Sequence, residues 1–583
     1  MRSLAVLPGA LPAPPIRDER SRASRPRGTL CERAVTIAAV KRLPLITVLA
    51  VLGVAIVLTI VGGLVGSATP SASPGGPIGR MPSPATSSQS TSSSPSVGEA
   101  SPGAPSESQA PTASPIGAVA IVPVTNFRTP FDRTGREEVG SVLAGTSKTY
   151  DALELVESEA DTILAAVGAE RPADAKRLIL APDAASLAAD LAANRKRLAF
   201  LRADEVGPSV RALGWGDRQL FGVGAAETLE AWGLAAMLPL NGAAFDPAAT
   251  WTLVAGGDIM LDRGVAQTVK INKKGVDFPF NGGLADITSR YCCSGRGWDL
   301  PRVTRVGKGG AVRALVSGAD LAIANFENPA PDNFRYHTTG TVFSADPALI
   351  EGLANAGIDW VSLANNHIGD AGRTGILQTI DNLADFGIAS GGAGRNARAA
   401  RRPTILEAGG IKIGILGYDT IAPGYRAGSD KPGSASLSAD IVAQDIQKAH
   451  DAGATLVIVF PHWGTEYDPT PFKGQQDLAR AAIDGGADLV IGNHAHWAGA
   501  MEIYEGKPIW YALGNFVFDQ TWSEPTMEGI TLELTFRGAD LVQARMRPHI
   551  ILDKAQPNFL DPAGDGRVVM GQIFNASKGL LEW

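Results

Sequence analysis

The sequence predicts an α/β protein with a polar site at one edge of its sheet. Between residues 249 and about 553, short apolar runs with the length of buried strands alternate with helical patterns. Several of these runs end directly in Asn, His, Asp or Glu. Because ligands bind outside the carboxyl ends of the strands in open α/β sheets, we expect these polar residues to converge on one site.

Five strand-like runs carry the candidate site residues, and four of them begin at a glycine. The runs and their polar tips are 251–255 with Asp258, 318–324 with Asn325 and Glu327, 357–364 with Asn366 and His367, 453–460 with His462, and 486–491 with His494 and His496. The helical patterns fall at 347–356, 374–386, 441–452 and 475–485.

The last tip contains two histidines two positions apart. In an extended segment His494 and His496 would share a face, so the strand would deliver both as metal ligands. A lone pair of this spacing is more often an ordinary surface feature, but the agreement of five tips favours a joint site.

The candidate ligands offer nitrogen and oxygen but no thiolate, which suits Mn, Fe or Zn better than a soft metal. We predict one or two divalent ions. The predicted ligands are Asp258, Glu327, Asn366, His462, His494 and His496. Such a site would acidify a bound water molecule and hydrolyse its substrate.

His367 and Asp370 form the candidate catalytic pair, a general acid and the carboxylate that orients it. Two structural alternatives stay open: Asn366 can cap the following turn, and His367 can be a satisfied polar group. His337, His450 and His549 have no motif around them, and we expect them to be structural.

Composition limits the class of protein. A length of 583 residues corresponds to two to four folding units, and a net charge of −7 argues against a nucleic-acid partner. Three cysteines are too few for a disulfide framework. We expect the adjacent Cys292 and Cys293 to be small buried side chains or a loop pair, with a redox centre as the less favoured alternative.

The amino-terminal part predicts a membrane anchor. Residues 1–44 contain nine basic and three acidic side chains, a composition that predicts a disordered cytoplasmic tail. Residues 45–66 are uncharged over 22 positions, enough for one transmembrane helix in the bilayer. The basic flank places the amino end inside and the rest of the chain outside the cell membrane, as a single-pass protein. The small residues Gly66 and Ala68 leave a cleaved signal open.

The rest of the chain divides into four segments. Residues 67–117 are rich in Ser and Pro and predict a disordered stalk. Residues 118–248 predict a small α/β domain of unknown role, and 249–553 the main domain. Residues 554–583 are a carboxyl-terminal extension.

Six ordered motifs in the main domain resemble those of the CapA family of poly-γ-glutamate capsule biosynthesis proteins. They are GDIMLDR at 257–263, NFEN at 325–328, SLANNHIGDAG at 362–372, FPHWGTEY at 460–467, GNHAHW at 492–497 and ALGNFVFDQ at 512–520. The family resembles the calcineurin-like metallophosphoesterases. The resemblance therefore implies a metallophosphatase-like four-layer α/β/β/α sandwich.

The resemblance also implies roles for the ligands. One ion would bind to Glu327, Asn366, His462 and His494, and a second, weaker one to Asp258, Glu327 and His496. Two positions depart from the phosphoesterase pattern: Met260 stands where a ligand histidine is expected, and Glu327 replaces a shorter aspartate. A thioether is a poor ligand for these metals, which is why the second ion is expected to be weaker.

Two functions follow from the resemblance. In the first, the domain is a metal-dependent hydrolase in capsule or exopolymer synthesis or export. In the second, it is a non-catalytic polymer-binding or scaffold subunit of the same machinery. Either function implies polyglutamate or another anionic polymer and other capsule synthesis subunits as partners, and fold alone does not decide between them.

Overall fold

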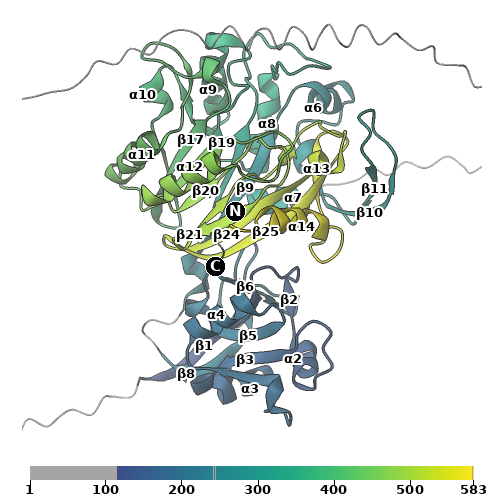
Figure 1. Ribbon diagram of the computed structural model, residues 1–583, viewed down its shortest axis with the longest axis vertical. Coiled ribbons are helices and arrows are strands. Elements are labelled where there is room, and N and C mark those ends of the chain that lie inside the picture. Colours follow the sequence, from purple (N-terminus) through teal and green to yellow (C-terminus); the bar gives the residue numbers. More distant parts are fainter. Residues whose placement is uncertain (1–113, 241, 243–244, 581, 583) are drawn as a thin grey trace, which may run out of the picture. The chain divides into compact units, whose positions relative to one another are not determined.

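The computed structural model describes residues 114–580 and 582, apart from residues 241, 243 and 244 (Figure 1). The predicted tail, the predicted span at 45–66 and nearly all of the predicted stalk lie outside the described residues. Among the residues that the structure describes, no helix has the length and apolarity needed to cross a membrane.

Residues 116–239 form an α/β unit around a six-stranded sheet with the order β4-β3-β5-β1-β6 and with β8 also paired to β1. Its strands are β1 (Ile116–Asn126), β3 (Ala152–Val156), β4 (Leu178–Ala181), β5 (Arg197–Arg202), β6 (Val210–Ala212) and β8 (Ala235–Pro239). Its helices are α2 (Arg136–Leu143), α3 (Ala160–Val167), α4 (Ala184–Ala193) and α5 (Leu229–Trp232). The short strands β2 (Arg133–Thr134) and β7 (Gly214–Trp215) pair separately.

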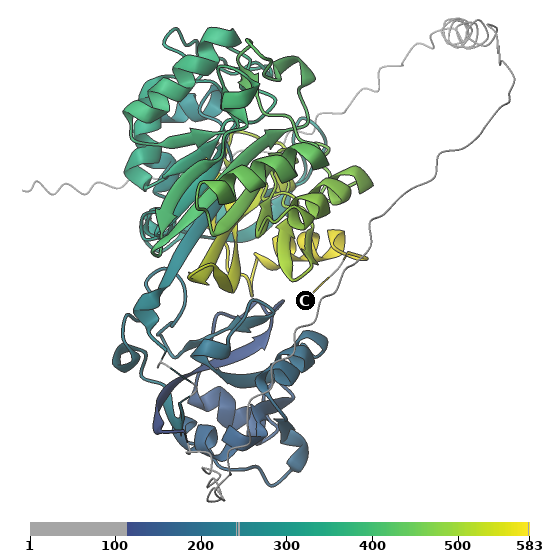
Figure 2. The ribbon, with the colours of Figure 1, turned by 90° about the vertical axis from the view of Figure 1, so that its left-hand side faces the viewer.

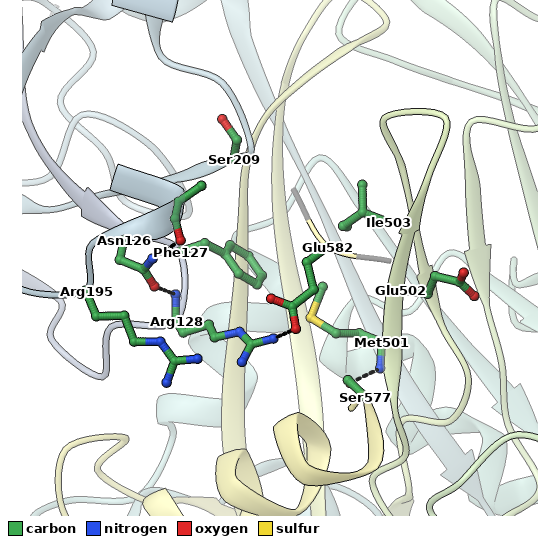
Figure 3. A pocket seen from close by; sticks show the side chains of 11 residues that line it. Asn126, Phe127, Arg128, Arg195, Ser209, Met501, Glu502, Ile503, Ser577 and Glu582 are labelled. Atoms are coloured by element: carbon green, nitrogen blue, oxygen red, sulfur yellow. Dashed lines mark hydrogen bonds and ion pairs between the residues drawn. The ribbon is translucent and has the colours of Figure 1, made fainter. Parts of the chain in front are cut away.

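Direct contacts connect this unit to the main domain. The backbone N–H of Val223 donates to Glu533 at 2.8 Å, and the Arg211 guanidinium donates to the carbonyl of Ala544 at 3.3 Å. Arg128 forms an ion pair with Glu582 (Figure 3). These contacts join residues that are far apart in the sequence. The α/β region of residues 116–239 and the main domain therefore belong to one compact unit.

The main domain contains a ten-stranded and a six-stranded sheet. The first has the order β11-β10-β26-β25-β24-β9-β12-β13-β14, with β23 paired to β9. Its strands are β9 (Thr250–Ile259), β10 (Leu284–Tyr291), β11 (Leu300–Val306), β12 (Leu321–Phe326), β13 (Trp360–Ser362), β14 (Ala389–Gly391), β23 (Asn515–Val517), β24 (Glu528–Arg537), β25 (Asp540–Leu552) and β26 (Gln556–Phe559).

The second sheet has the order β16-β17-β19-β20-β22-β21. Its strands are β16 (Thr404–Ala408), β17 (Ile411–Asp419), β19 (Leu456–His462), β20 (Leu489–Ile491), β21 (Met501–Tyr504) and β22 (Lys507–Trp510). A separate pair joins β15 (Ala393–Gly394) to β18 (Gly433–Ser434).

Helices cover the outer faces of both sheets (Figures 1 and 2). The helices of the main domain are α6 (Arg263–Ala266), α7 (Ala311–Ser317), α8 (Ile350–Ala356), α9 (Gly372–Asp385), α10 (Ala397–Ala400), α11 (Ala439–Asp451), α12 (Lys473–Asp484), α13 (Glu524–Met527) and α14 (Arg567–Ala576). The four helical patterns of the sequence correspond to α8, α9, α11 and α12. For example, α11 begins where the Ser438 side chain accepts from the backbone N–H of Ile441.

Successive side chains of a strand point to opposite faces of its sheet, so the two sheets border three apolar layers. Leu253 and Ala255 of β9 and Ile458 of β19 pack together between the two sheets. Val254 faces α7 and α8 on one outer side, and Val457 faces α11 on the other. The result is the four-layer α/β/β/α sandwich that the resemblance implied.

Two elements of the predicted carboxyl-terminal extension, β26 and α14, take part in this sandwich. Strand β26 pairs with β25 and β10, and Ile573 of α14 is buried in the layer between the sheets. What we predicted as an extension therefore contributes to the core of the main domain.

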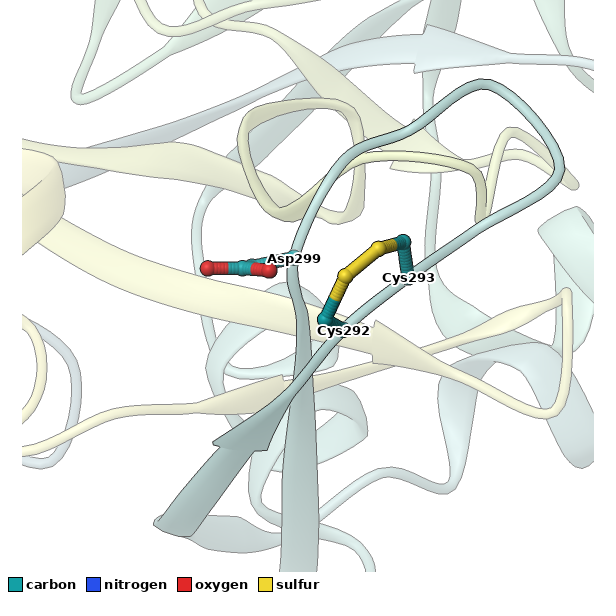
Figure 4. Close-up of side chains that lie close together, drawn as sticks. All are labelled: Cys292, Cys293 and Asp299. Atoms are coloured by element: carbon teal, nitrogen blue, oxygen red, sulfur yellow. A yellow bond between two sulfur atoms is a disulfide. The ribbon is translucent and has the colours of Figure 1, made fainter.

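Cys292 and Cys293 form a disulfide in the loop between β10 and β11 (Figure 4). Both cysteines are exposed. They therefore form a loop pair, the second of the two structural interpretations offered by the sequence, and are not buried.

Candidate metal centre

The carboxyl ends of strands from both sheets deliver the predicted ligands. Asp258 is the second-last residue of β9, and Glu327 follows β12. Both strands belong to the ten-stranded sheet, where the backbone N–H of Glu327 donates to the carbonyl of Ile259 at 2.8 Å. In the six-stranded sheet His462 ends β19, while His494 and His496 follow β20.

Five of the six predicted ligands form two groups that share one carboxylate. The first group is Glu327, His462 and His494, and the second is Asp258, Glu327 and His496. Within each group the ligand atoms lie within 4.8 Å of one another. These are the two sets that the resemblance implied for two ions, apart from Asn366.

Short distances link the two groups. Glu327 Oε1 lies 3.7 Å from His462 Nε2 and 3.7 Å from His496 Nε2. Asp258 Oδ2 lies 3.4 Å from His496 Nδ1, and His494 Nδ1 lies 3.0 Å from His462 Nε2. All five side chains are at most 3% exposed, so the groups are removed from bulk water.

Asn366, the sixth predicted ligand, lies beside the first group. Its Oδ1 is 2.8 Å from His462 Nε2, and its Nδ2 is 3.1 Å from His367 Nε2. Asn366 therefore contacts both a candidate ligand and the candidate general acid, a position that a turn cap would not explain.

The predicted pair of His367 and Asp370 is also formed. His367 Nδ1 lies 2.9 Å from Asp370 Oδ2, and the same carboxylate accepts from the backbone N–H of Phe343 and the hydroxyl of Tyr425. His367 Nε2 lies 3.9 Å from Glu327 Oε1. The imidazole thus has one nitrogen held by Asp370 and the other directed at the shared carboxylate.

The backbone around the last two histidines corrects one expectation. The sequence predicted that His494 and His496 share the face of an extended segment, but β20 ends at Ile491. His494 has φ of 91° and His496 has φ of 56°, both in the left-handed region that non-glycine residues rarely adopt. A turn therefore brings the two imidazoles to the site, and such backbone strain is commonest at functional sites.

The sequence indicated Asn325 only as a polar residue at a strand end and assigned Asn515 no role. Asn325 Nδ2 donates to Asp258 Oδ1 at 2.7 Å and lies 3.2 Å from His462 Nδ1. Asn515 Oδ1 lies 2.9 Å from His496 Nδ1. The motifs at 325–328 and 512–520 contain both asparagines, so the signal was present, although only the register between strands assigns the partners.

Met260 is a core residue in the structure. It is fully buried in the apolar layer between the ten-stranded sheet and its helices, and its sulfur accepts from the backbone N–H of Asp262 at 3.0 Å. Position 260 therefore supplies packing to this apolar layer.

The electrostatics of the site fit a divalent cation. Both oxygens of Glu327 are buried without a hydrogen-bond partner among the described residues. Burial, with Asp258 as the next cause, raises the pKa of Glu327 well above its usual value. Burial also lowers the pKa of His462 well below its usual value and that of His494 to about 3. Neutral imidazoles around a desolvated carboxylate are a donor set that a bound cation would satisfy.

A cavity of about 330 Å³ opens beside the two groups. His367 and His496 contribute to its wall, together with two arginines and several aromatic side chains. A substrate in this cavity would lie directly against the candidate metal centre.

The four layers and the paired ligand groups define a domain of the metallophosphatase-like class. Residues 252–520 match the sequence model of the family described as bacterial capsule synthesis protein PGA_cap. This part of the chain is similar to that family, and the match covers less than half of the chain.

Two relatives illustrate the similarity. The chain is 31% identical over 280 residues to the capsule biosynthesis protein CapA of Bacillus anthracis, covering 47% of this chain and 61% of the relative. It is 32% identical over 216 residues to the PGA biosynthesis protein CapA of Bacillus subtilis, covering 36% of this chain and 57% of the relative. The match thus spans about three fifths of each curated relative.

A solved structure is similar at lower identity. The NAD nucleotidase of Haemophilus influenzae aligns over 57% of this chain and 56% of its own, with 13% identity and a TM-score of 0.30.

Proposed function

We propose that the protein is a membrane-anchored, extracytoplasmic component of capsule or exopolymer synthesis or export, with poly-γ-glutamate as the polymer. We further propose that it contains a metal-dependent hydrolase site. The names of the two CapA relatives support the pathway. The observation that carries the hydrolase site is Glu327, a buried, unpartnered carboxylate shared by two histidine-containing groups.

The residues that would hold the ions are those brought together at the strand ends. Glu327, His462 and His494 would bind one Mn, Fe or Zn ion with Asn366 beside them, and Asp258, Glu327 and His496 would bind the other. Bound divalent ions supply Lewis acidity, which polarises a scissile group and lowers the pKa of water.

The chain itself supplies proton transfer and orientation. Asp370 holds the His367 Nδ1 and fixes the ring, and Nε2 lies 3.1 Å from Asn366 Nδ2 and 3.9 Å from Glu327 Oε1. A proton on Nε2 can then be donated to the leaving oxygen of a substrate bound in the cavity. Because Phe343 packs against the His367 ring with centroids 4.1 Å apart and the planes tilted by 34°, it limits rotation of the imidazole.

The alternative function, a polymer-binding or scaffold subunit without catalysis, has one observation in its favour. Met260 is packed in the core at the position where the phosphoesterase pattern has a histidine ligand. The second ion would then bind weakly or be absent, while the cavity could still hold an anionic polymer.

The membrane part of the proposal rests on the uncharged run at 45–66 and its basic flank. In this arrangement the described domains lie outside the cell, where they can contact an exported anionic polymer and other capsule synthesis subunits. The net charge of −7 gives no support to a nucleic-acid partner.

Hydrolysis assays on the full-length protein test the proposal. With added Mn²⁺ we expect cleavage of a chromogenic phosphodiester or shortening of poly-γ-glutamate, and we expect His462→Ala to lower the rate by about a hundredfold. His450→Gln is the matched control, since His450 lies on α11 and its Nδ1 contacts the carbonyl of Ala454. Full capsule production in cells carrying His462→Ala would favour the scaffold function instead.

A further inference from the structure

The hairpin of β10 and β11 extends a loop to the mouth of the cavity beside the metal centre. Trp298 of this loop packs edge-to-face on Trp497, with centroids 5.9 Å apart, and on Trp522 at 6.3 Å. Trp497 directly follows the candidate ligand His496. These contacts hold the loop against the segments around Trp497 and Trp522, although the loop begins more than 160 residues earlier in the sequence than these segments.

Aromatic side chains on this side of the cavity stay accessible. Trp298 is 41% exposed, and Trp497, Trp522 and Tyr467 are partly exposed. Tyr467 packs on Trp522 with centroids 4.9 Å apart. Exposed aromatic groups gathered at a cavity are typical of surfaces that bind a ligand by stacking and apolar contact.

Two arginines line the same cavity, and their surroundings differ. Arg263 pairs with Asp519 at 2.5 Å and donates to the carbonyl of Gly340 at 2.7 Å. The Arg296 guanidinium lies over the ring of Trp522 at 4.5 Å, and among the described residues it forms no ion pair with a carboxylate. Arg296 therefore keeps its fork of donors available for a ligand, on a platform that fixes its plane.

We propose that the loop between β10 and β11 is a substrate-binding arm in which Arg296 pairs with an oxyanion of the substrate. Trp298, Trp522 and Tyr467 pack against the flat or apolar groups next to that oxyanion. This inference rests on the proposed function. It adds that the site selects substrates with a negative charge on the side of the candidate metal centre where the β10–β11 hairpin lies. An anionic chain presents such a charge in every repeat, whereas a small neutral ester does not.

Tryptophan fluorescence of the full-length protein measures this binding, because three of the aromatic residues are tryptophans. We expect titration with a γ-glutamyl oligopeptide to saturate, and Arg296→Gln to weaken the affinity by about tenfold through the loss of a charge-assisted contact. Arg296→Lys should recover part of the affinity, since it keeps the charge but loses the fork. A parallel titration with inorganic phosphate tells a carboxylate from a phosphate as the oxyanion.

Arg302→Gln is the matched control. Arg302 lies on the same hairpin, in β11, and its guanidinium packs over Tyr291 at 4.7 Å without lining the cavity. We expect this variant to bind both probes as the wild type does. Equal affinity of Arg296→Gln and the wild type for both probes, or no saturable binding by the wild type, would overturn the inference.

The titration also separates this inference from the proposed hydrolase. Repeated in the presence of a chelator, it reports the arm without the ions. Binding that depends on Arg296 in a protein without hydrolytic activity would count against the hydrolase alone. Hydrolysis that proceeds with binding independent of Arg296 would count against the arm alone.

Discussion

At the scale of single residues, Glu327 determines what the site can hold. A fully buried carboxylate without a hydrogen-bond donor is destabilising, and Asp258 beside it adds repulsion. Three histidines with buried imidazoles surround this pair of carboxylates. A bound divalent cation would offset the desolvation of both carboxylates at once.

Replacing the shared carboxylate tests this explanation in the metal-free protein. The pKa of Glu327 is raised, so below its usual value of 4.5 the group is neutral in both the folded and the unfolded state and has no effect. As the pH rises above that value, the unfolded state releases the proton more readily and the fold loses stability. With a chelator at pH 8 we expect Glu327→Gln to raise Tm, by about 2–4 °C for each kcal/mol recovered.

Calorimetry at pH 4 and pH 8 measures this difference, which should vanish at the lower pH. Glu407→Gln is the control, because Glu407 is exposed on β16. Added Mn²⁺ should reverse the order by stabilising the wild type more than the variant. A wild type more stable than Glu327→Gln in chelator at pH 8 would show that the chain itself satisfies the carboxylate.

The individual site residues differ in how far the sequence could predict their positions. Asp258, Glu327 and His462 follow or end apolar strands, so their convergence was predictable from the rule for strand ends. The positions of His494 and His496 depend on positive φ angles that no propensity of histidine indicates. The support from Asn325 depends on a shift in register between β12 and β9, which local patterns do not contain.

At the scale of elements, one buried aspartate holds the loop that faces the hairpin arm. Asp262 accepts from the backbone N–H groups of His337 and Ser344 at 2.9 Å and from His337 Nδ1 at 2.5 Å. This loop contains Phe343, which packs against the ring of His367. His337 is structural, as expected, and the role of Asp262 is to fix a wall of the cavity.

We expect Asp262→Asn to loosen residues 337–344, since the amide has one acceptor oxygen in place of two and cannot form the charge-assisted contacts. Hydrogen exchange followed by mass spectrometry should show protection in this segment reduced by about tenfold or more. Asp332→Asn is the control, because Asp332 contacts Gln378 and Asn382 near the surface. Unchanged protection in Asp262→Asn would show that other contacts hold the loop.

Strands that form by pairing with distant parts of the chain could not be predicted from local sequence patterns. The parallel strands β9, β12, β19 and β20 and the helices between them follow from alternating apolar runs. The hairpin of β10 and β11 is largely exposed, so it has no apolar periodicity to identify it. Strand β26 is four residues long and gains its place only by pairing with β25 and β10.

At the scale of the whole molecule, the candidate metal centre lies where the two sheets meet. The ten-stranded sheet supplies Asp258 and Glu327, and the six-stranded sheet supplies His462, His494 and His496. The layer between the sheets is fully apolar around Leu253 and Ile458. Bound metal would therefore join the two halves of the sandwich, and metal affinity would depend on their packing.

We predict that two divalent ions would share Glu327, and metal stoichiometry of the full-length protein tests this prediction most directly. By mass spectrometry at saturating Mn²⁺ we predict two ions per chain, matching the two ligand groups. His462→Ala and His496→Ala should each lose a different ion, the second ion being the first to leave on dialysis, and Glu327→Gln should lose both. A wild type that binds no metal, or a Glu327→Gln variant that keeps both ions, would contradict the account.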